Sequence, residues 1–588
     1  MKKINIFLLL FVVLLAAIHQ SCKKQNFLDD KSVGTITDPF VDSAQTMAFV
    51  NRFYEEIGFN FKKERWENGN TEQATDDAEY TLLNPQRRTV SLWLGNYSGF
   101  DFKHGDVWSL PWVNIRRVNL LLANISRTPL SAELRSRIIG EAKFMRAYFY
   151  QYLIASFGGV PLIADTIYGT TGVANININL KRNTYEECVN YIKNEYDAAA
   201  ALLPAPNAPQ SSIYDFQRDY GRATKGHCMG MKARLLLYAA SPLFNGGVIA
   251  AATAENKPLA GYPVYDVARW QAAADAANAV INSGYYSLNV NNTRPGLGFY
   301  ELFTKRINPE YIVFVNRPNN RDIEERYLPS SRNGGKHTQP TQSLVECFPM
   351  KSGKAITDPT SGYNPQNPYI NRDPRFGFSI IYNQSNWLNS GGTYTPVVTE
   401  VGTGQDNVPA GTFTGYYARK MCDTTVYGNG TRPNLTERGW PLLRYAEILL
   451  SYAEAINETG QTALAYPKMI ELRQRAGIDP GVDNLYGLKP NMTVAEMRTV
   501  IRNERHIELA FEADNRWDDI RRLKTAEVVN NGNNTVIRIT RSGSTLTYAV
   551  ETTVLADRKH SFRPEMYLFP IPVDELKKML LMIQNPGW

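Results

Sequence analysis

Signatures of catalytic and cofactor sites are absent from this sequence. It contains no GxxxxGK[ST], GxSxG or HExxH motif and no calcium loop of the EF-hand kind. The six histidines show no ligand spacing, and the five cysteines form no CxxC pair. We therefore expect neither a cofactor nor a metal. A glycoside hydrolase is not excluded by these absences, because its two carboxylates have no signature in sequence.

An excess of basic residues is also absent. The 64 Lys and Arg residues and 57 Asp and Glu residues give a formal net charge of only +7 over 588 residues. They do not gather into the basic stripe that a nucleic-acid protein needs, so we expect no nucleic-acid partner. Glycine (41 residues) and proline (32 residues) occur at average frequency, which is typical of an ordinary globular chain rather than a disordered one.

Cysteine is sparse. Four of the five cysteines lie far apart in the body of the chain: Cys188, Cys228, Cys347 and Cys422. These four could pair into two disulfides, and the sequence alone does not decide between pairing and free thiols. We expect them to be buried free thiols.

A long apolar run opens the chain. Two lysines precede 13 apolar residues from Ile6 to Ile18, which is typical of a secretory signal and too short for a membrane span of about 20 residues. Ser21 stands directly before Cys22, which is the layout of a bacterial lipoprotein signal. We expect cleavage after residue 21 and a lipid anchor on Cys22. The alternative is ordinary cleavage upstream, which would leave Cys22 as a spare thiol.

Helical periodicity dominates the first half of the chain. From Ser131 to Phe157, apolar residues recur at steps of four and three, a capping serine stands at the start and Gly158 follows the end. This is the clearest predicted helix. Similar patterns predict further helices over 42–57, 107–125, 184–203, 221–240 and 265–282.

Two short helices near the C-terminus form a pair of the tetratricopeptide type. Apolar residues step by four and three over 442–456 and, after a glycine turn, over 465–476. Thr493 and Glu496 form a capping box that opens another helix, predicted to run past Phe511. The chain is longer than the roughly 250–300 residues at which a single core stops growing. We therefore expect several domains or a stacked array of repeats.

Helical periodicity is lost between residues 284 and 439. Asn, Gly, Pro, Thr and Tyr dominate there, and short β-like stretches such as 311–315 appear. We interpret this part as a loop-rich layer laid over the helices. Alternating residues from 535 to 550, around a Ser-Gly-Ser turn, predict a small β-hairpin.

Acidic pairs occur in the Arg-rich helices near the C-terminus. Glu504 with Glu508 and Asp518 with Asp519 provide the carboxylates that a glycosidase needs. Ion pairing and solvation beside the neighbouring arginines explain these pairs better. These arginines are Arg502, Arg505, Arg516, Arg521 and Arg522. We therefore predict no catalytic role for the acidic pairs.

Pieces of sequence throughout the chain resemble those of one family. The run over 141–162, EAKFMRAYFYQYLIASFGGVPL, resembles the signature helix of the RagB/SusD family, the surface nutrient-binding lipoproteins of Bacteroidetes. Further matching pieces follow in family order, among them NRDPRF at 371–376, NERHIELAFE at 503–512 and YLFPIP at 567–572. Two departures are His506, where the family usually has Arg, and Ala513-Asp514, which replaces a Gly.

The resemblance implies a mainly α fold, a superhelix of tetratricopeptide-like helix pairs (SusD-like) with a loop-rich variable half and minor β-hairpins. It implies a signal peptide over 1–21, a lipidated N-terminus and tether over 22–39, and a single SusD-like domain over 40–588. Within this domain we expect three parts. They are a helical core over 40–283 and 440–526, a loop-rich ligand-side layer over 284–439, and a hairpin with the C-terminal segment over 527–588.

The resemblance also implies a role. Members of the family sit on the outer membrane, facing the cell surface, bind a glycan or another nutrient and form a lid on a SusC-like, TonB-dependent transporter. We therefore expect a non-enzymatic lipoprotein, held by the lipid on Cys22, that captures an oligosaccharide and delivers it to such a transporter. Three alternatives stay open: a peptide ligand, as in RagB-like members, a glycoside hydrolase, and a purely architectural helical-repeat scaffold.

Ligand contacts are expected in the variable parts, where flat aromatic rings stack on sugars and polar side chains bind hydroxyls. The stretch over 62–105 concentrates such residues between two predicted helices. Trp387 is a second candidate, because its amide neighbours predict exposure. The predicted contacts are Trp66, Tyr80, Trp93, Asn96, Tyr97 and Trp387. For the two tryptophans of the first stretch, the alternative is that they anchor a long loop to the core.

Overall fold

A computed structural model of the chain describes residues 38–58, 70–84, 87–102, 106–168, 179–389, 391–426, 436–553 and 556–588. Cys22 and Trp66, which the sequence predicts to be functional, lie outside these ranges. Within the ranges, no helix combines the length and the apolarity that a membrane span requires.

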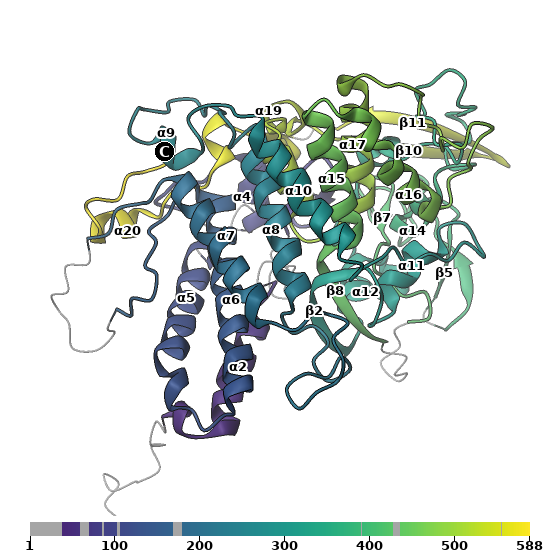
Figure 1. Ribbon diagram of the computed structural model, residues 1–588. Helices are drawn as coiled ribbons and strands as arrows, with labels where there is room; N and C mark the ends of the chain where they lie inside the picture. Colours follow the sequence, from purple (N-terminus) through teal and green to yellow (C-terminus); the bar gives the residue numbers. More distant parts are fainter. Residues whose placement is uncertain are drawn as a thin grey trace, which may run out of the picture.

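Long helices form the body of the protein. They are α2 (Ser43–Glu56), α5 (Asp106–Asn124), α6 (Ala132–Phe157), α7 (Tyr185–Leu202), α8 (Lys225–Ala240), α10 (Ala268–Asn282), α15 (Tyr445–Glu458), α16 (Tyr466–Ala476) and α17 (Val494–Leu509). From α5 to α8, then to α10, α15 and α17, each helix packs against the next (Figure 1). This stack confirms the predicted mainly α, tetratricopeptide-like fold.

Capping residues set the ends of these helices. Side-chain oxygens of Ser131, Thr184 and Thr493 accept hydrogen bonds from the first turns of α6, α7 and α17. α6 ends at Phe157, and Gly158 after it has a φ of +73°, a conformation that glycine adopts without steric cost. The predicted helices are thus confirmed, although α8 begins later than predicted.

The end of α17 differs from the prediction. The helix stops at Leu509 instead of continuing past Phe511. Phe511 and Ala513 have φ values of +64° and +49°, which lie outside the helical region. Ala513 stands where the family usually has Gly, so this chain keeps the left-handed turn without the residue that favours it.

Short elements complete the fold. The shorter α-helices are α4 (Arg88–Leu94), α9 (Lys257–Ala260), α11 (Leu297–Thr304), α12 (Asp322–Tyr327), α13 (Gln342–Cys347), α14 (Pro374–Ser379), α18 (Asn515–Arg522), α19 (Ala526–Val529) and α20 (Val573–Lys578). Single 3-10 turns lie at η1 (Pro39–Val41), η3 (Thr71–Ala74), η4 (Ile125–Arg127), η5 (Ser330–Arg332), η6 (Thr462–Leu464), η7 (Ala556–Arg558) and η8 (Pro564–Tyr567). In its described residues, the part predicted to be loop-rich thus carries only short helices among its turns and strands.

The strands form two-stranded antiparallel ladders. The pairs are β1 (Ala78–Tyr80) with β3 (Thr338–Pro340), β2 (Tyr311–Asn320) with β8 (Thr436–Arg444), β4 (Ile380–Ile381) with β7 (Tyr417–Ala418), β5 (Asn386–Leu388) with β6 (Tyr394–Pro396), β9 (Asn531–Gly532) with β12 (His560–Ser561), and β10 (Thr535–Ser542) with β11 (Thr545–Thr552). The last pair confirms the predicted hairpin. The helix predicted over 442–456 begins only at Tyr445, because the residues before it belong to β8.

A buried network of charges joins the helical stack to the loop-rich layer. Arg375 in α14 binds Glu504 at 2.6 Å and Glu508 at 2.7 Å, both in α17. Arg444, the last residue of β8, binds Glu508 at 2.7 Å, and Arg473 binds Glu504 at 2.8 Å. The predicted ion pairing of these two glutamates is confirmed. Their predicted solvation is wrong, because both side chains are fully buried and the arginines that bind them here lie outside α17.

The four cysteines of the described residues are free, as predicted. Cys188, Cys228 and Cys422 are buried, and Cys347 is half-buried. The three buried cysteines pack as small apolar side chains inside the protein, whereas Cys347 is less buried than predicted.

Candidate functional site

The aromatic platform predicted over 62–105 is largely buried. Trp93 in α4 donates its indole N–H to the Asp557 carbonyl at 3.3 Å, and its ring stacks on His560 at 5.8 Å. Tyr97 packs against Trp588 with ring centres 5.2 Å apart, and burial raises the pKa of its hydroxyl well above the ordinary value. The prediction that these two rings face a ligand is therefore wrong, because the C-terminal segment covers them.

Tyr80 is buried as well. It lies in β1, where its ring stacks on His337 with centres 5.8 Å apart. Its prediction as a ligand contact is also wrong, because the ring is buried where β1 pairs with β3 of the loop-rich layer. Asn96, by contrast, is exposed and stays a predicted contact. Trp66 lies outside the described residues.

Trp387 is only 1% exposed, so its predicted exposure is also wrong. The Arg419 guanidinium lies 5.0 Å from the centre of its ring. Of the amide side chains near it, Asn383 is buried and donates to Glu400 at 3.2 Å, whereas Gln384 and Asn386 are exposed beside the buried ring. A run of amide residues in sequence therefore does not identify an exposed ring here.

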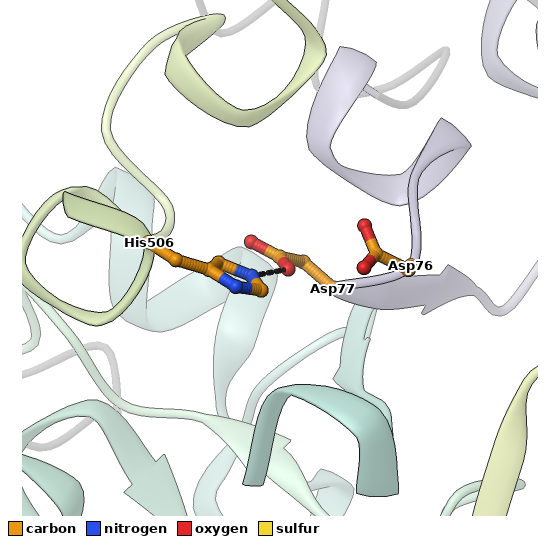
Figure 2. Close-up of side chains that lie close together, drawn as sticks. All are labelled: Asp76, Asp77 and His506. Carbon is orange, nitrogen blue, oxygen red and sulfur yellow. Dashed lines mark hydrogen bonds and ion pairs between the residues drawn. The ribbon is translucent and has the colours of Figure 1, made fainter. Parts of the chain in front are cut away.

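A buried acidic cluster lies where the segment over 70–80 meets α17 and α18. His506 bonds to Asp77, and Asp76 lies on the far side of Asp77 (Figure 2). The Arg516 guanidinium holds Asp76 at 2.8 and 2.5 Å. Burial and Arg516 act to lower the pKa of His506, but the Asp77 carboxylate outweighs them and holds the pKa well above its ordinary value. The imidazole is therefore charged at neutral pH.

This cluster does not suit a metal ion, although Asp76, Asp77 and His506 lie close enough to share one. Arg516 already neutralises Asp76 and lies 3.6 Å from Asp77, and His506 neutralises Asp77. A cation would have to displace both positive side chains. We assign the cluster a structural role, because it joins the segment over 70–80 to the helical stack.

A groove of two adjoining parts opens beside α2, β2 and the loop between α7 and α8. The outer part has a volume of about 660 Å³ and the inner part about 320 Å³. The two parts share Tyr220, Gly221, Arg222 and Phe314. We call this feature the α2–β2 groove.

A run of aromatic rings lines the α2–β2 groove. Phe216 contacts Tyr220 with ring centres 5.4 Å apart, and Tyr220 contacts Phe314 at 4.7 Å. Tyr311 continues the run, 5.2 Å from Phe314. Side chains three apart would point to opposite faces of a regular strand, but a register shift between Val313 and Phe314 brings these two together. Phe216 is 39% exposed, so its ring is open to a ligand.

Polar side chains stand along the same groove. Asn51, Glu55 and Asn316 are exposed in its outer part. Arg222 donates to the Asn51 side-chain oxygen at 2.7 Å, and its guanidinium lies 4.8 Å from the ring centre of Tyr54. An exposed ring such as that of Phe216, near amide and guanidinium groups, is the combination that binds sugar rings and their hydroxyls.

None of the groove residues is among those predicted from the sequence. Phe216 and Tyr220 lie in the segment over 203–224 together with Asn, Gln and Asp residues, the same composition that marked 62–105. Composition could therefore have indicated this loop. It could not indicate that the loop lies beside α2 and β2, which are distant in the chain.

A second pocket of about 290 Å³ lies between α5, the segment after α6 and α20. Trp112, Met579 and Met582 line it with other mostly apolar side chains. It is smaller than the outer groove and offers fewer groups for hydroxyls. The α2–β2 groove is therefore the better candidate for a sugar ligand.

Two family models match the chain. The model described as the SusD family matches residues 307–588, and the model described as "Starch-binding associating with outer membrane" matches residues 26–217. The matches do not overlap and together span most of the chain. A curated relative, SusD-like protein P2 of Formosa agariphila, is 32% identical over 163 residues, which are 27% of this chain and 28% of that protein.

Solved structures share the fold over nearly the whole chain. A SusD-like protein of Bacteroides fragilis aligns with a TM-score of 0.73 at 24% identity, covering 94% of this chain and 98% of that one. A SusD-like carbohydrate binding protein of the same species aligns with a TM-score of 0.69 at 21% identity, covering 92% and 99%. Surface glycan-binding protein A of Bacteroides fluxus aligns with a TM-score of 0.59 at 18% identity, covering 93% and 100%. The chain belongs to the SusD/RagB family.

Proposed function

We propose that this protein is a cell-surface lipoprotein that binds an oligosaccharide in the α2–β2 groove and delivers it to a SusC-like, TonB-dependent transporter of the outer membrane. The family description, starch binding in association with the outer membrane, supports this role. The names of two structural relatives, a carbohydrate binding protein and a surface glycan-binding protein, support the ligand class.

The observation that carries the proposal is the exposed end of the aromatic run. Phe216 presents its ring at the groove, with Tyr220 and Phe314 behind it. A sugar ring can stack on such a face while exposed side chains such as Asn51 and Asn316 bind its hydroxyls. Affinity would then come from stacking and a modest set of hydrogen bonds, without a cofactor.

The chemistry of the groove favours binding over hydrolysis. Asp219 is a carboxylate of the inner part. Burial acts to raise its pKa, but hydrogen bonds from Arg218 and Arg137 outweigh burial and lower the pKa to about 2. A general acid of a glycosidase needs the opposite, a carboxyl group that stays protonated near neutral pH. Asp219 is therefore an anchor for arginine and not an acid catalyst.

Attachment to the membrane is proposed through Cys22. Asp38, where the described part begins, is bonded to Arg127 near the end of α5. We propose that the residues between Cys22 and this point act as a tether. Several acyl chains on one cysteine would hold the protein firmly, where a single chain would not.

The test is calorimetric titration of the mature chain with neutral and acidic oligosaccharides and with short peptides. We expect an oligosaccharide to bind, and Phe216→Ala to weaken its binding by roughly tenfold, since a stacking ring is worth about 1 kcal/mol or more. Tyr265→Ala is the matched control, because Tyr265 is 56% exposed and does not line the groove. Binding of peptides alone would contradict the glycan ligand, and release of cleaved sugar would contradict a purely binding role.

A further inference from the structure

The two parts of the α2–β2 groove differ in depth. The outer part is bordered by the exposed side chains of Asn51, Glu55 and Asn316. The inner part reaches down to side chains that are less than one-tenth exposed, among them Tyr214 and Thr224, while the exposed side chains of Asn207 and Phe216 border its mouth. A ligand in the outer part would thus lie along the surface, whereas one that enters the inner part would reach buried side chains.

The floor of the inner part is the first turn of α8. A Cβ atom added at Gly226 would lie 2.2 Å from the Tyr286 hydroxyl, so that ring is packed directly onto the helix backbone. His227 is 5% exposed, bonds to the Thr224 hydroxyl at 2.9 Å and contacts the Phe144 ring of α6 at 5.8 Å. Helices α8 and α6 therefore close the inner part from below, and a ligand that enters cannot pass through.

The arginine side chains that line the groove are already paired with carboxylates. Arg222 binds Glu141 at 2.6 Å, and Asp219 binds Arg137 at 3.0 Å. Arg317 binds Asp322 at 2.8 Å. Burial lowers the pKa of His227 to about 3, so this imidazole is neutral at physiological pH. A ligand with carboxylate or sulfate groups would have to break one of these pairs, whereas an uncharged ligand would not.

We propose that the inner part of the α2–β2 groove takes the terminal residue of an uncharged oligosaccharide, while the following residues lie along the outer part. This inference rests on the proposed glycan function and adds that the protein selects chain ends over the interior of a polymer. A volume of about 320 Å³ is at the lower limit of small-molecule pockets, which hold roughly 300–1,000 Å³. This volume suits the terminal sugar of an oligosaccharide.

The experiment measures the binding of the mature wild-type protein to an array of neutral and acidic oligosaccharides and to the polysaccharide from which each is derived. The same measurements are made on a plugged variant, in which a large side chain blocks the inner part. Asn207→Trp places a large ring at the mouth of the inner part, where Asn207 is exposed and borders the cavity. Asn190→Trp, at an exposed position of α7, is the matched control. Unfolding midpoints of both variants are measured first, so that loss of binding is not confused with loss of folding.

We expect the wild type to bind at least one neutral oligosaccharide roughly tenfold more tightly, per sugar chain, than its parent polysaccharide, and Asn207→Trp to abolish this preference. Equal binding of oligosaccharide and polymer would overturn the inference while leaving the glycan function intact, as would a plugged variant that binds normally. Stronger binding of acidic than of neutral oligosaccharides would also overturn it. A wild type that binds no glycan would contradict the proposed function itself.

Discussion

The guanidinium of Arg444 and the carboxylate of Glu508 lie 2.7 Å apart, and both side chains are at most 1% exposed. Arg444 ends strand β8 and Glu508 lies in α17, so the pair joins the strand ladder beside the groove to the helical stack. Glu508 also binds Arg375 and Arg475. One carboxylate thus forms ion pairs with three arginines from three different elements.

Removing this carboxylate should destabilise the whole fold. We expect Glu508→Gln to lower the free energy of unfolding by about 3–5 kcal/mol, because buried guanidinium groups would lose their counter-charge. Burial acts to raise the pKa of Glu508, but the three arginines and Lys420 hold it well below its ordinary value. Denaturant unfolding at neutral pH measures the loss.

A matched control for this change is Glu458→Gln. Glu458 pairs with Arg498 at 2.6 Å, and the arginine side chain is 34% exposed. We expect this substitution to cost less than about 1 kcal/mol, as for other solvent-accessible pairs. Similar losses for Glu458→Gln and Glu508→Gln would show that the buried network has no special role in stability.

Because His506 pairs with Asp77, the contribution of His506 to the free energy of unfolding should fall as the pH rises into the alkaline range. The pKa of His506 is raised in the folded state, so its contribution is fully present below pH 6.5, the ordinary pKa of histidine, and is lost as the pH rises through the raised value. We therefore expect His506→Gln to destabilise the protein more at pH 6 than at pH 9. Unfolding free energies at the two pH values measure the difference.

His227→Gln is the control for this titration. The pKa of His227 is lowered to about 3 by burial, so this residue is neutral at both pH values. In the unfolded state, however, His227 has its ordinary pKa of 6.5 and is largely protonated at pH 6, which favours unfolding there. We therefore expect His227→Gln to destabilise the protein less at pH 6 than at pH 9, the opposite direction from His506→Gln. An effect of His506→Gln that does not depend on pH, or that follows the direction of His227→Gln, would contradict the charged state assigned to His506.

Most of the fold could be predicted from the sequence, because long helices carry their own signals. The steps of four and three over 131–157 and the capping threonines at 184 and 493 are local, and these helices are confirmed. The pairing of β2 with β8 joins residues more than a hundred positions apart. No local signal reports such a pairing, which is why the start of α15 was misplaced.

The candidate site could not be predicted in the same way, because exposure depends on what covers a residue. Trp93 and Trp387 have the composition of a sugar platform around them, but distant segments bury both rings. Phe216 has a similar local composition and is exposed. Only the packing of α2, β2 and the loop after α7 distinguishes these cases.

Trp93→Ala should therefore affect stability and not ligand affinity. We expect the free energy of unfolding to fall by about 3–5 kcal/mol, as for other buried aromatic side chains truncated to alanine. Asn96→Ala, three residues along the chain at an exposed position, should change stability by less than about 0.5 kcal/mol. Thermal and denaturant unfolding, followed by titration with the bound oligosaccharide, separate the two effects. Weakened glycan binding by a stably folded Trp93→Ala protein would instead support the prediction from the sequence that Trp93 contacts the ligand.

The turn after α6 should tolerate no side chain at Gly159. A Cβ atom there would lie 2.0 Å from the Asn183 carbonyl oxygen, which belongs to a fixed backbone. We expect Gly159→Ala to cost about 1–3 kcal/mol of unfolding free energy through overpacking. Gly377→Ala, where no atom lies within 4 Å of the added Cβ, is the control and should be neutral or slightly stabilising. Equal tolerance of both substitutions would contradict the close approach at Gly159.

The most direct test of the central claim is an experimental structure of the mature chain with a bound oligosaccharide found by titration. We expect a sugar ring stacked on Phe216, with hydroxyls bonded to the outer part of the α2–β2 groove. A sugar bound instead between α5 and α20, with no contact to Phe216, would contradict the assignment of the ligand site to this groove.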